Sequence, residues 1–158
     1  MGCLPGRPVH LRSLGRGLLV PASVVFAVRA LIAAMGDDPA SIPALGPITG
    51  ITGALALPGI LLIGWAGRKD DRGMAALAVA SVLVGHFLFR GDLAPIGPGF
   101  VYLGSGLAAA QPLGVLAGLV AMIGSLLRGD GYDVGHWLVL LGAAATAVAL
   151  VRGMRRDI

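Results

Sequence analysis

The chain has 158 residues, of which 56% are hydrophobic and only 13% are charged. Its mean hydropathy of +0.88 is far above that of a soluble globular domain and indicates a single membrane domain. The net charge of +4 does not indicate a nucleic-acid partner, because the basic residues fall mainly at the ends of apolar segments and form no basic-aromatic stripe. The single cysteine, Cys3, excludes an intrachain disulfide and a cysteine-cluster metal site, and no metal is expected.

The first predicted membrane helix follows a short basic segment. Residues 1–16 carry Arg7, Arg12 and Arg16 and are expected to form a basic cytoplasmic lead. The apolar segment 17–35 is close to the ~20 residues that a helix needs to cross a bilayer. Arg29 lies inside it, where a charge is costly, and is therefore a functional candidate. The alternative is that its long side chain snorkels to the outer headgroups.

Two more helices are predicted at 48–67 and 74–89. The segment 36–46 contains acidic residues but no Lys or Arg, so we expect it outside, before the second helix. The basic segment 68–73 is expected inside, between the second and third helices. Pro58 and several glycines predict a bent second helix that packs closely on a neighbour.

The apolar stretch 99–127 is too long for one upright helix and too short for two full crossings of ~17 residues each. We expect one helix, kinked at Gln111-Pro112, because proline removes a backbone donor and clashes with the preceding turn. A last helix is predicted at 137–151, followed by a basic tail at 152–158.

The predicted fold class is an all-α integral membrane bundle over residues 17–151, with five apolar segments and four to six crossings. An inside N-terminus places more Lys and Arg on the inner side than on the outer side, as the positive-inside rule favours, and we expect the plasma membrane. The inner residues are Arg7, Arg12, Arg16, Arg68, Lys69, Arg72 and Arg128, and the outer residues are Arg90, Arg152, Arg155 and Arg156. Five crossings leave the basic C-terminus outside, against the same rule. A hairpin at 99–127, or an interfacial 137–151 segment, would give an even number of crossings and remove the conflict.

Two stretches of the sequence share one design. Gly36–Gly53 and Gly91–Gly106 each begin with Gly-Asp, pass through proline to Gly-Pro, and enter a glycine-rich apolar run. This similarity predicts a tandem repeat of two helical hairpins in the same orientation. The alternative is chance similarity between two Gly- and Pro-rich loops.

Polar residues are expected to converge on the outer side, beneath these two stretches. Such a pocket could hold an anionic or quinone-like headgroup, and the alternative is an ordinary polar rim. His86 and Arg29 are the catalytic candidates. The residues expected to bind substrate or lipid are Arg29, His86, Arg90, Asp92, Tyr102, Ser105 and Gln111.

Recognisable catalytic motifs do not occur in the sequence: there is no paired intramembrane carboxylate, nucleophile elbow or phosphate loop. No cofactor is expected, and the alternatives are a quinone or a haem. A haem would use the repeated Val-Gly-His tripeptides that end at His86 and His136. With five crossings these histidines lie on opposite sides, so a shared haem needs another topology or a second subunit.

Pairs of small residues separated by three positions are typical of close helix contacts in membranes. They predict packing within the bundle, or a homo- or hetero-oligomer formed through glycine-rich faces. The pairs are Gly46/Gly50, Gly114/Gly118 and Gly142/Thr146.

The segment 56–87, ALPGILLIGWAGRKDDRGMAALAVASVLVGHF, resembles the middle of DoxX-like small membrane proteins. In that family a Gly-Leu-Leu-rich second helix leads through a short basic turn to an Ala/Leu third helix. The resemblance implies a four-helix bundle and, in some members, an accessory subunit of a quinone-linked or thiol-redox assembly. The fifth apolar run and the Gly/Pro-rich outer loops depart from that pattern.

Two functions remain open from the sequence. The first is an accessory or scaffold subunit that packs on partner membrane helices within the lipid bilayer. The second is a membrane-embedded enzyme or redox component that acts on a lipophilic or quinone-like substrate in an outer-leaflet pocket.

Overall fold

The computed structural model describes residues 7–66, 72–88 and 96–157, and within these residues the chain forms helices and no strand. The helices are α1 (Arg7–Ala34), the short 3₁₀ helix η1 (Pro39–Ser41), α2 (Leu45–Trp65), α3 (Arg72–Leu88), α4 (Gly97–Ala108), α5 (Pro112–Gly129) and α6 (Val134–Asp157). Four of them, α1, α2, α5 and α6, are long and apolar enough to cross a membrane. The prediction of an all-helical membrane bundle is confirmed.

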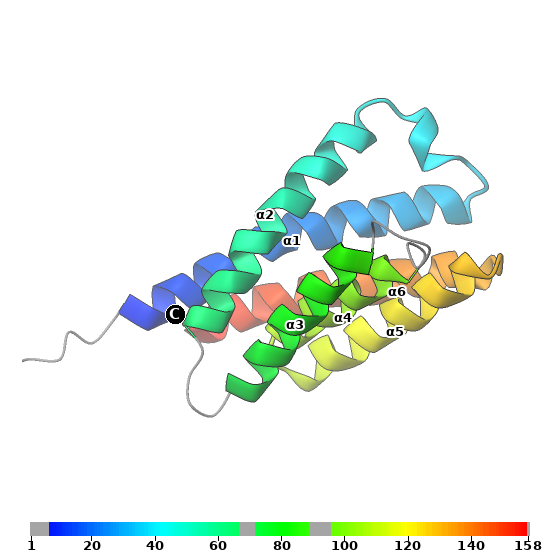
Figure 1. Ribbon diagram of the computed structural model, residues 1–158. Coiled ribbons are helices and arrows are strands. Elements are labelled where there is room, and N and C mark those ends of the chain that lie inside the picture. The colour runs from blue at the N-terminus through cyan, green and yellow to red at the C-terminus, as the bar shows by residue number, and fades with distance from the viewer. Residues whose placement is uncertain (1–6, 67–71, 89–95, 158) are drawn as a thin grey trace, which may run out of the picture.

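Successive α-helices run in opposite directions, so both ends of the chain come to the same end of the bundle (Figure 1). We call the end that holds the start of α1 and the end of α6 the terminal end. The opposite end, with η1 and the turn between α5 and α6, is called the far end. Helix α1 packs on α2 and α6, α5 packs on α4 and α6, and α3 packs on α4. Leu19, Ile60, Val82 and Leu150 lie in the main core.

The stretch 99–127 forms two helices, and the expectation of one kinked helix is wrong. Helix α4 ends at Ala108, and Ala110 then adopts a positive φ of 51°. Gln111 is extended, with φ −141° and ψ 148°, because a following proline disfavours the helical conformation. Pro112 begins α5 at a position where its missing N–H costs nothing. Helices α4 and α5 therefore form a hairpin, which brings the C-terminus back to the same end of the bundle as the N-terminus. The five-crossing topology, which placed the two termini on opposite sides, is wrong.

The basic segments at both chain ends belong to helices. Helix α1 begins at Arg7, inside the expected lead, and α6 continues through the expected basic tail to Asp157. Arg16 is only 3% exposed. Its Nε donates to the Ala108 carbonyl at 3.2 Å, and its Nη1 donates to the Gly153 carbonyl at 2.9 Å. Since the end of a helix leaves carbonyls without intrahelical partners, this buried cation satisfies the last carbonyl of the short helix α4, that of Ala108.

Glycines allow several helix pairs to approach closely. A Cβ on Gly59 of α2 would lie 2.8 Å from the Gly15 carbonyl of α1. A Cβ on Gly114 of α5 would lie 2.5 Å from the Gly106 carbonyl of α4. Both distances are shorter than real Cβ contacts, so a side chain at either position would push the helices apart. The pair Gly46/Gly50 behaves differently, because a Cβ at either residue would meet no atom within 4 Å.

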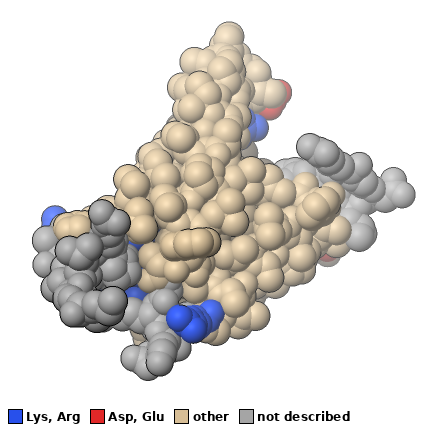
Figure 2. Space-filling model, turned by 60° about the vertical axis from the view of Figure 1, so that its left-hand side comes forward, with Lys and Arg blue, Asp and Glu red and all other residues tan. Residues whose placement is uncertain are grey.

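Helix α2 diverges from the other helices toward the far end (Figure 1). Its contact with α1 at Gly59 lies on the terminal side of Pro58, which removes a backbone hydrogen bond inside the helix. Figure 2 shows the part at the top of both views, where α2 begins, standing out from the rest, and the described surface of this face is mostly uncharged. An uncharged flank of this kind is suited to lipid, and the divergence of α2 opens a space inside the bundle.

Candidate functional site

A partly open cavity of about 600 Å³ lies between α2 and the helices α1, α3, α4 and α5. Its lining is mostly apolar or glycine, with a few polar side chains, as is usual for sites that bind small molecules. The lining residues are Phe26, Arg29, Gly46, Thr49, Gly50, Gly53, Ala54, Ala56, Leu57, His86, Pro98, Val101, Tyr102 and Arg128.

The α2 wall of the cavity is built from small residues. Gly46, Gly50 and Gly53 line it, and a Cβ at any of them would meet nothing within 4 Å. These glycines therefore widen the cavity and do not hold α2 against a neighbouring helix. The opposite wall includes Pro98 and Val101 of α4. Gly46 and Pro98 each stand in the first turn of their helix, so the beginnings of α2 and α4 face the same space.

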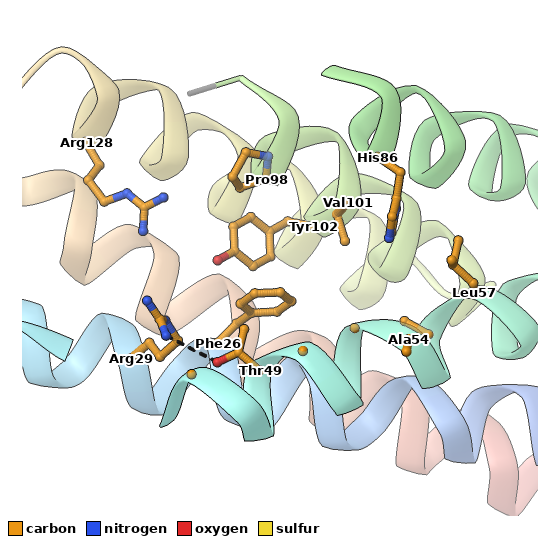
Figure 3. A pocket seen from close by; sticks show the side chains of 14 residues that line it. Phe26, Arg29, Thr49, Ala54, Leu57, His86, Pro98, Val101, Tyr102 and Arg128 are labelled. Carbon is orange, nitrogen blue, oxygen red and sulfur yellow. Dashed lines mark hydrogen bonds between the residues drawn. The ribbon is translucent and has the colours of Figure 1, made fainter. Parts of the chain in front are cut away.

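One end of the cavity is polar and aromatic (Figure 3). Arg29 of α1 donates from Nη1 to the Thr49 hydroxyl of α2 at 3.2 Å, which joins the two helices beside the cavity. Thr49 in turn donates to the Leu45 carbonyl at 2.6 Å. Tyr102 of α4 is 6% exposed, and its ring meets Phe26 edge to face with centroids 5.1 Å apart. This contact holds the Tyr102 hydroxyl toward the arginine end.

Arg128 completes the polar end from the last turn of α5. Figure 3 shows its guanidinium and that of Arg29 turned toward the Tyr102 hydroxyl from opposite sides. No carboxylate is among the described residues that line the cavity. The polar end therefore combines two cations with a hydroxyl donor, and the described wall supplies no negative charge to offset them.

His86 lies toward the other end of the cavity, closer to Ala54 and Leu57 than to the two arginines (Figure 3). Its Nδ1 lies 3.0 Å from the Val82 carbonyl one turn earlier in α3. Because a carbonyl only accepts, Nδ1 carries the proton in this hydrogen bond. This bond fixes the ring orientation and places an imidazole against an otherwise apolar part of the wall.

The structure brings together three of the seven residues predicted to form the site: Arg29, His86 and Tyr102. Ser105 does not line the cavity, and its hydroxyl is buried and donates to the Val101 carbonyl within α4 at 2.9 Å. Gln111 lies at the α4–α5 junction and donates to the Ala149 carbonyl of α6 at 2.9 Å. The expectation that Gln111 reaches into the pocket therefore fails, because the break that precedes α5 carries it to the terminal end. The predictions for Arg90 and Asp92 lie outside the described residues.

Sequence reasoning missed three lining residues that shape the polar end: Phe26, Thr49 and Arg128. Arg128 was assigned to the inner side because 99–127 was treated as one crossing. If Pro112 had been interpreted as the first residue of a new helix, the sequence would have predicted Arg128 at the same end of the bundle as Arg29. Phe26 and Thr49 carry no comparable signal, since an aromatic residue and a threonine in apolar helices are usually packing residues.

The two histidines considered as haem ligands do not share the cavity. His86 lines it, whereas His136 near the start of α6 does not. Over the part of the chain that the structure describes, no group of three or more His, Cys, Asp or Glu side chains is placed to hold a metal ion.

Comparisons of the chain with protein-family models, with curated proteins and with solved structures found no match.

Proposed function

We propose that this integral membrane protein binds a lipophilic molecule from the bilayer in the cavity between α2 and α4. The observation that carries the proposal is the combination of an apolar, glycine-walled cavity with one polar end, placed where α2 diverges from its neighbours. A ligand with a long apolar part and a polar head matches this division. The site supports binding, and we assign no reaction to His86 or Arg29.

The proposed orientation places the terminal end in the cytoplasm and the cavity in the outer half of the plasma membrane. Among the described residues, the terminal end holds most of the arginines, whereas the far end holds two. Those of the terminal end are Arg7, Arg12, Arg16, Arg72, Arg152, Arg155 and Arg156, and those of the far end are Arg29 and Arg128. The positive-inside rule supports this orientation once α4 and α5 form a hairpin.

Filling the cavity tests the proposal. The double substitution Gly50→Leu/Gly53→Leu adds apolar side chains that meet no atom at the Cβ position, so we expect the fold to persist while bound lipophile falls about tenfold or more. Lipid that remains with the purified protein can be measured by native mass spectrometry and by extraction. Gly73→Leu is the matched control, because a Cβ at Gly73 in α3 also meets nothing within 4 Å and Gly73 does not line the cavity. Equal lipid retention in the two variants would refute the proposal.

A second function, an accessory or scaffold subunit, is favoured by one observation. The face of α2 that carries Gly46, Gly50 and Gly53 is open, and small residues allow another membrane helix to approach closely. The DoxX-like resemblance is consistent with such a role and stays a prediction. Under this hypothesis Gly50→Leu/Gly53→Leu would release a copurifying membrane protein, while Gly73→Leu would retain it. Loss of a bound protein without loss of bound lipid would favour the accessory role.

A further inference from the structure

We infer that the polar end of the cavity binds a phosphate-type anionic headgroup, held by Arg29, Arg128 and the Tyr102 hydroxyl. This inference rests on the proposed function, because it names the class of lipophile that the same cavity takes. The group recognised is the phosphate, and the lipid carries it at the polar end of an apolar chain.

The positive charge at the polar end favours an anion. Two guanidinium groups from different helices turn toward one point, and the described lining contains no carboxylate. Charges brought together away from bulk water repel one another and lose hydration. An anion placed between them offsets both costs. A neutral headgroup, such as that of a quinone, would leave both positive charges uncompensated.

The two guanidinium groups also have hydrogen-bond donors that the described residues do not use. A guanidinium has five N–H donors, and within the described residues Arg29 uses one of them, on Thr49. The Arg128 guanidinium forms no hydrogen bond or ion pair with the described part of the chain. Arginine donors form a planar fork that matches two phosphate oxygens, and the resulting charge-assisted bonds are stronger than neutral ones. The buried Tyr102 hydroxyl adds a third donor group from α4.

The apolar part of the cavity favours a lipid phosphate over free phosphate. Beyond the polar end, the cavity continues along Val101, Leu57 and Ala54 toward His86 (Figure 3). An inorganic anion would occupy only the arginine end and leave this apolar space without a partner. An acyl or prenyl chain attached to the phosphate fills it, and the divergence of α2 gives the chain a way into the bilayer.

The test uses the full-length protein in phosphatidylcholine nanodiscs that contain equal mole fractions of phosphatidate or of diacylglycerol with the same chains. Bound lipid is measured by native mass spectrometry, and inorganic phosphate is added as a competitor in a parallel series. We expect phosphatidate to be retained in preference to diacylglycerol. Arg29→Gln and Arg128→Gln should each weaken phosphatidate binding by about tenfold or more and leave diacylglycerol binding unchanged.

Matched variants keep the result interpretable. Arg152→Gln removes the same charge from an exposed position at the terminal end and should retain wild-type phosphatidate binding. Arg29→Lys and Arg128→Lys keep the charge without the fork and should recover part of the binding. A folding defect would lower the binding of both lipids, whereas loss of headgroup recognition lowers that of phosphatidate alone.

The outcomes distinguish this inference from the proposed function. If both lipids bind equally and both are lost in Gly50→Leu/Gly53→Leu, the cavity binds lipophiles without headgroup selection and the inference is overturned. If inorganic phosphate displaces phosphatidate at equal concentration, the site recognises a free anion and the assignment to a lipid is overturned. If the cavity-filling variant binds both lipids as the wild type does, the proposed function itself fails.

Discussion

Arg16 and Arg29 lie on the same helix, yet they are used differently. Arg16 is buried and directs two nitrogens at backbone carbonyls of α4 and α6. Arg29 is half-buried and has a threonine hydroxyl as its hydrogen-bond partner beside the cavity. The first arginine thus completes the fold where a helix ends early. The second keeps donors facing a space that a ligand can fill, which fits a binding role.

At the residue scale, the two hydrogen bonds of the buried Arg16 predict that removing its side chain destabilises the fold. Arg16→Met replaces a buried donor with an apolar chain and leaves the Ala108 and Gly153 carbonyls without their partner. A buried polar group left unsatisfied costs roughly 1–3 kcal/mol, so we expect a loss of about 2–4 kcal/mol and a clearly lower Tm in detergent. Arg155→Met, at an exposed position of the same end, is the control and should melt like the wild type. If Arg16→Met also melts like the wild type, the carbonyl contacts do not support the fold.

At the element scale, the sequence located the helices better than the turns between them. The apolar run 17–35 lies within α1 except for its last residue, the run 48–67 nearly matches α2, and the run 137–151 lies within α6. Hydropathy alone indicates whether a segment suits lipid. The break at Gln111-Pro112 was also located, but it was interpreted as a kink because the stretch 99–127 is too short for two full crossings. The structure resolves this with a helix α4 of only 12 residues. Arg16, far away in sequence, satisfies the Ala108 carbonyl at the end of this short helix. A contact of that kind leaves no local signal, and missing it placed Arg128 at the wrong end and removed it from the predicted site.

Glycines in the helices have two different roles: some allow close contact between helices, and others border open space. A Cβ on Gly106 of α4 would contact the Gly114 carbonyl and lie 2.8 Å from the Gly118 Cα. Gly106→Ala should therefore destabilise the α4–α5 hairpin by about 1–3 kcal/mol through overpacking. Gly50→Ala meets open space and should stabilise α2 by up to ~1 kcal/mol, because alanine is the better helix former. Denaturation in mixed detergent measures both, and equal effects of the two substitutions would contradict the packing described.

At the scale of the whole molecule, the α4–α5 hairpin fixes which groups face the same side of the membrane. It returns the basic end of α6 to the start of α1, and it brings Arg128 to the far end with Arg29. The turn at Ala110 and Gln111 is therefore what brings both arginines to the cavity, and it is what makes the proposed orientation agree with the positive-inside rule. A single long helix over 99–127 would send the basic C-terminus outward and separate the two arginines of the polar end.

The topology can be tested in intact cells with a membrane-impermeant maleimide and single cysteines in a Cys3→Ser background. Asp38 follows α1 and Asp130 follows α5, and both are exposed at the far end. We expect Asp38→Cys and Asp130→Cys to be labelled from outside, and Arg156→Cys to be labelled only after permeabilisation. Labelling of Arg156→Cys alone would reverse the orientation but retain the hairpin, because the two aspartate positions would still share one side. Labelling of Asp38→Cys with protection of Asp130→Cys would exclude the hairpin. That result would also place Arg29 and Arg128 on opposite sides of the membrane, so the proposed phosphate site could not form.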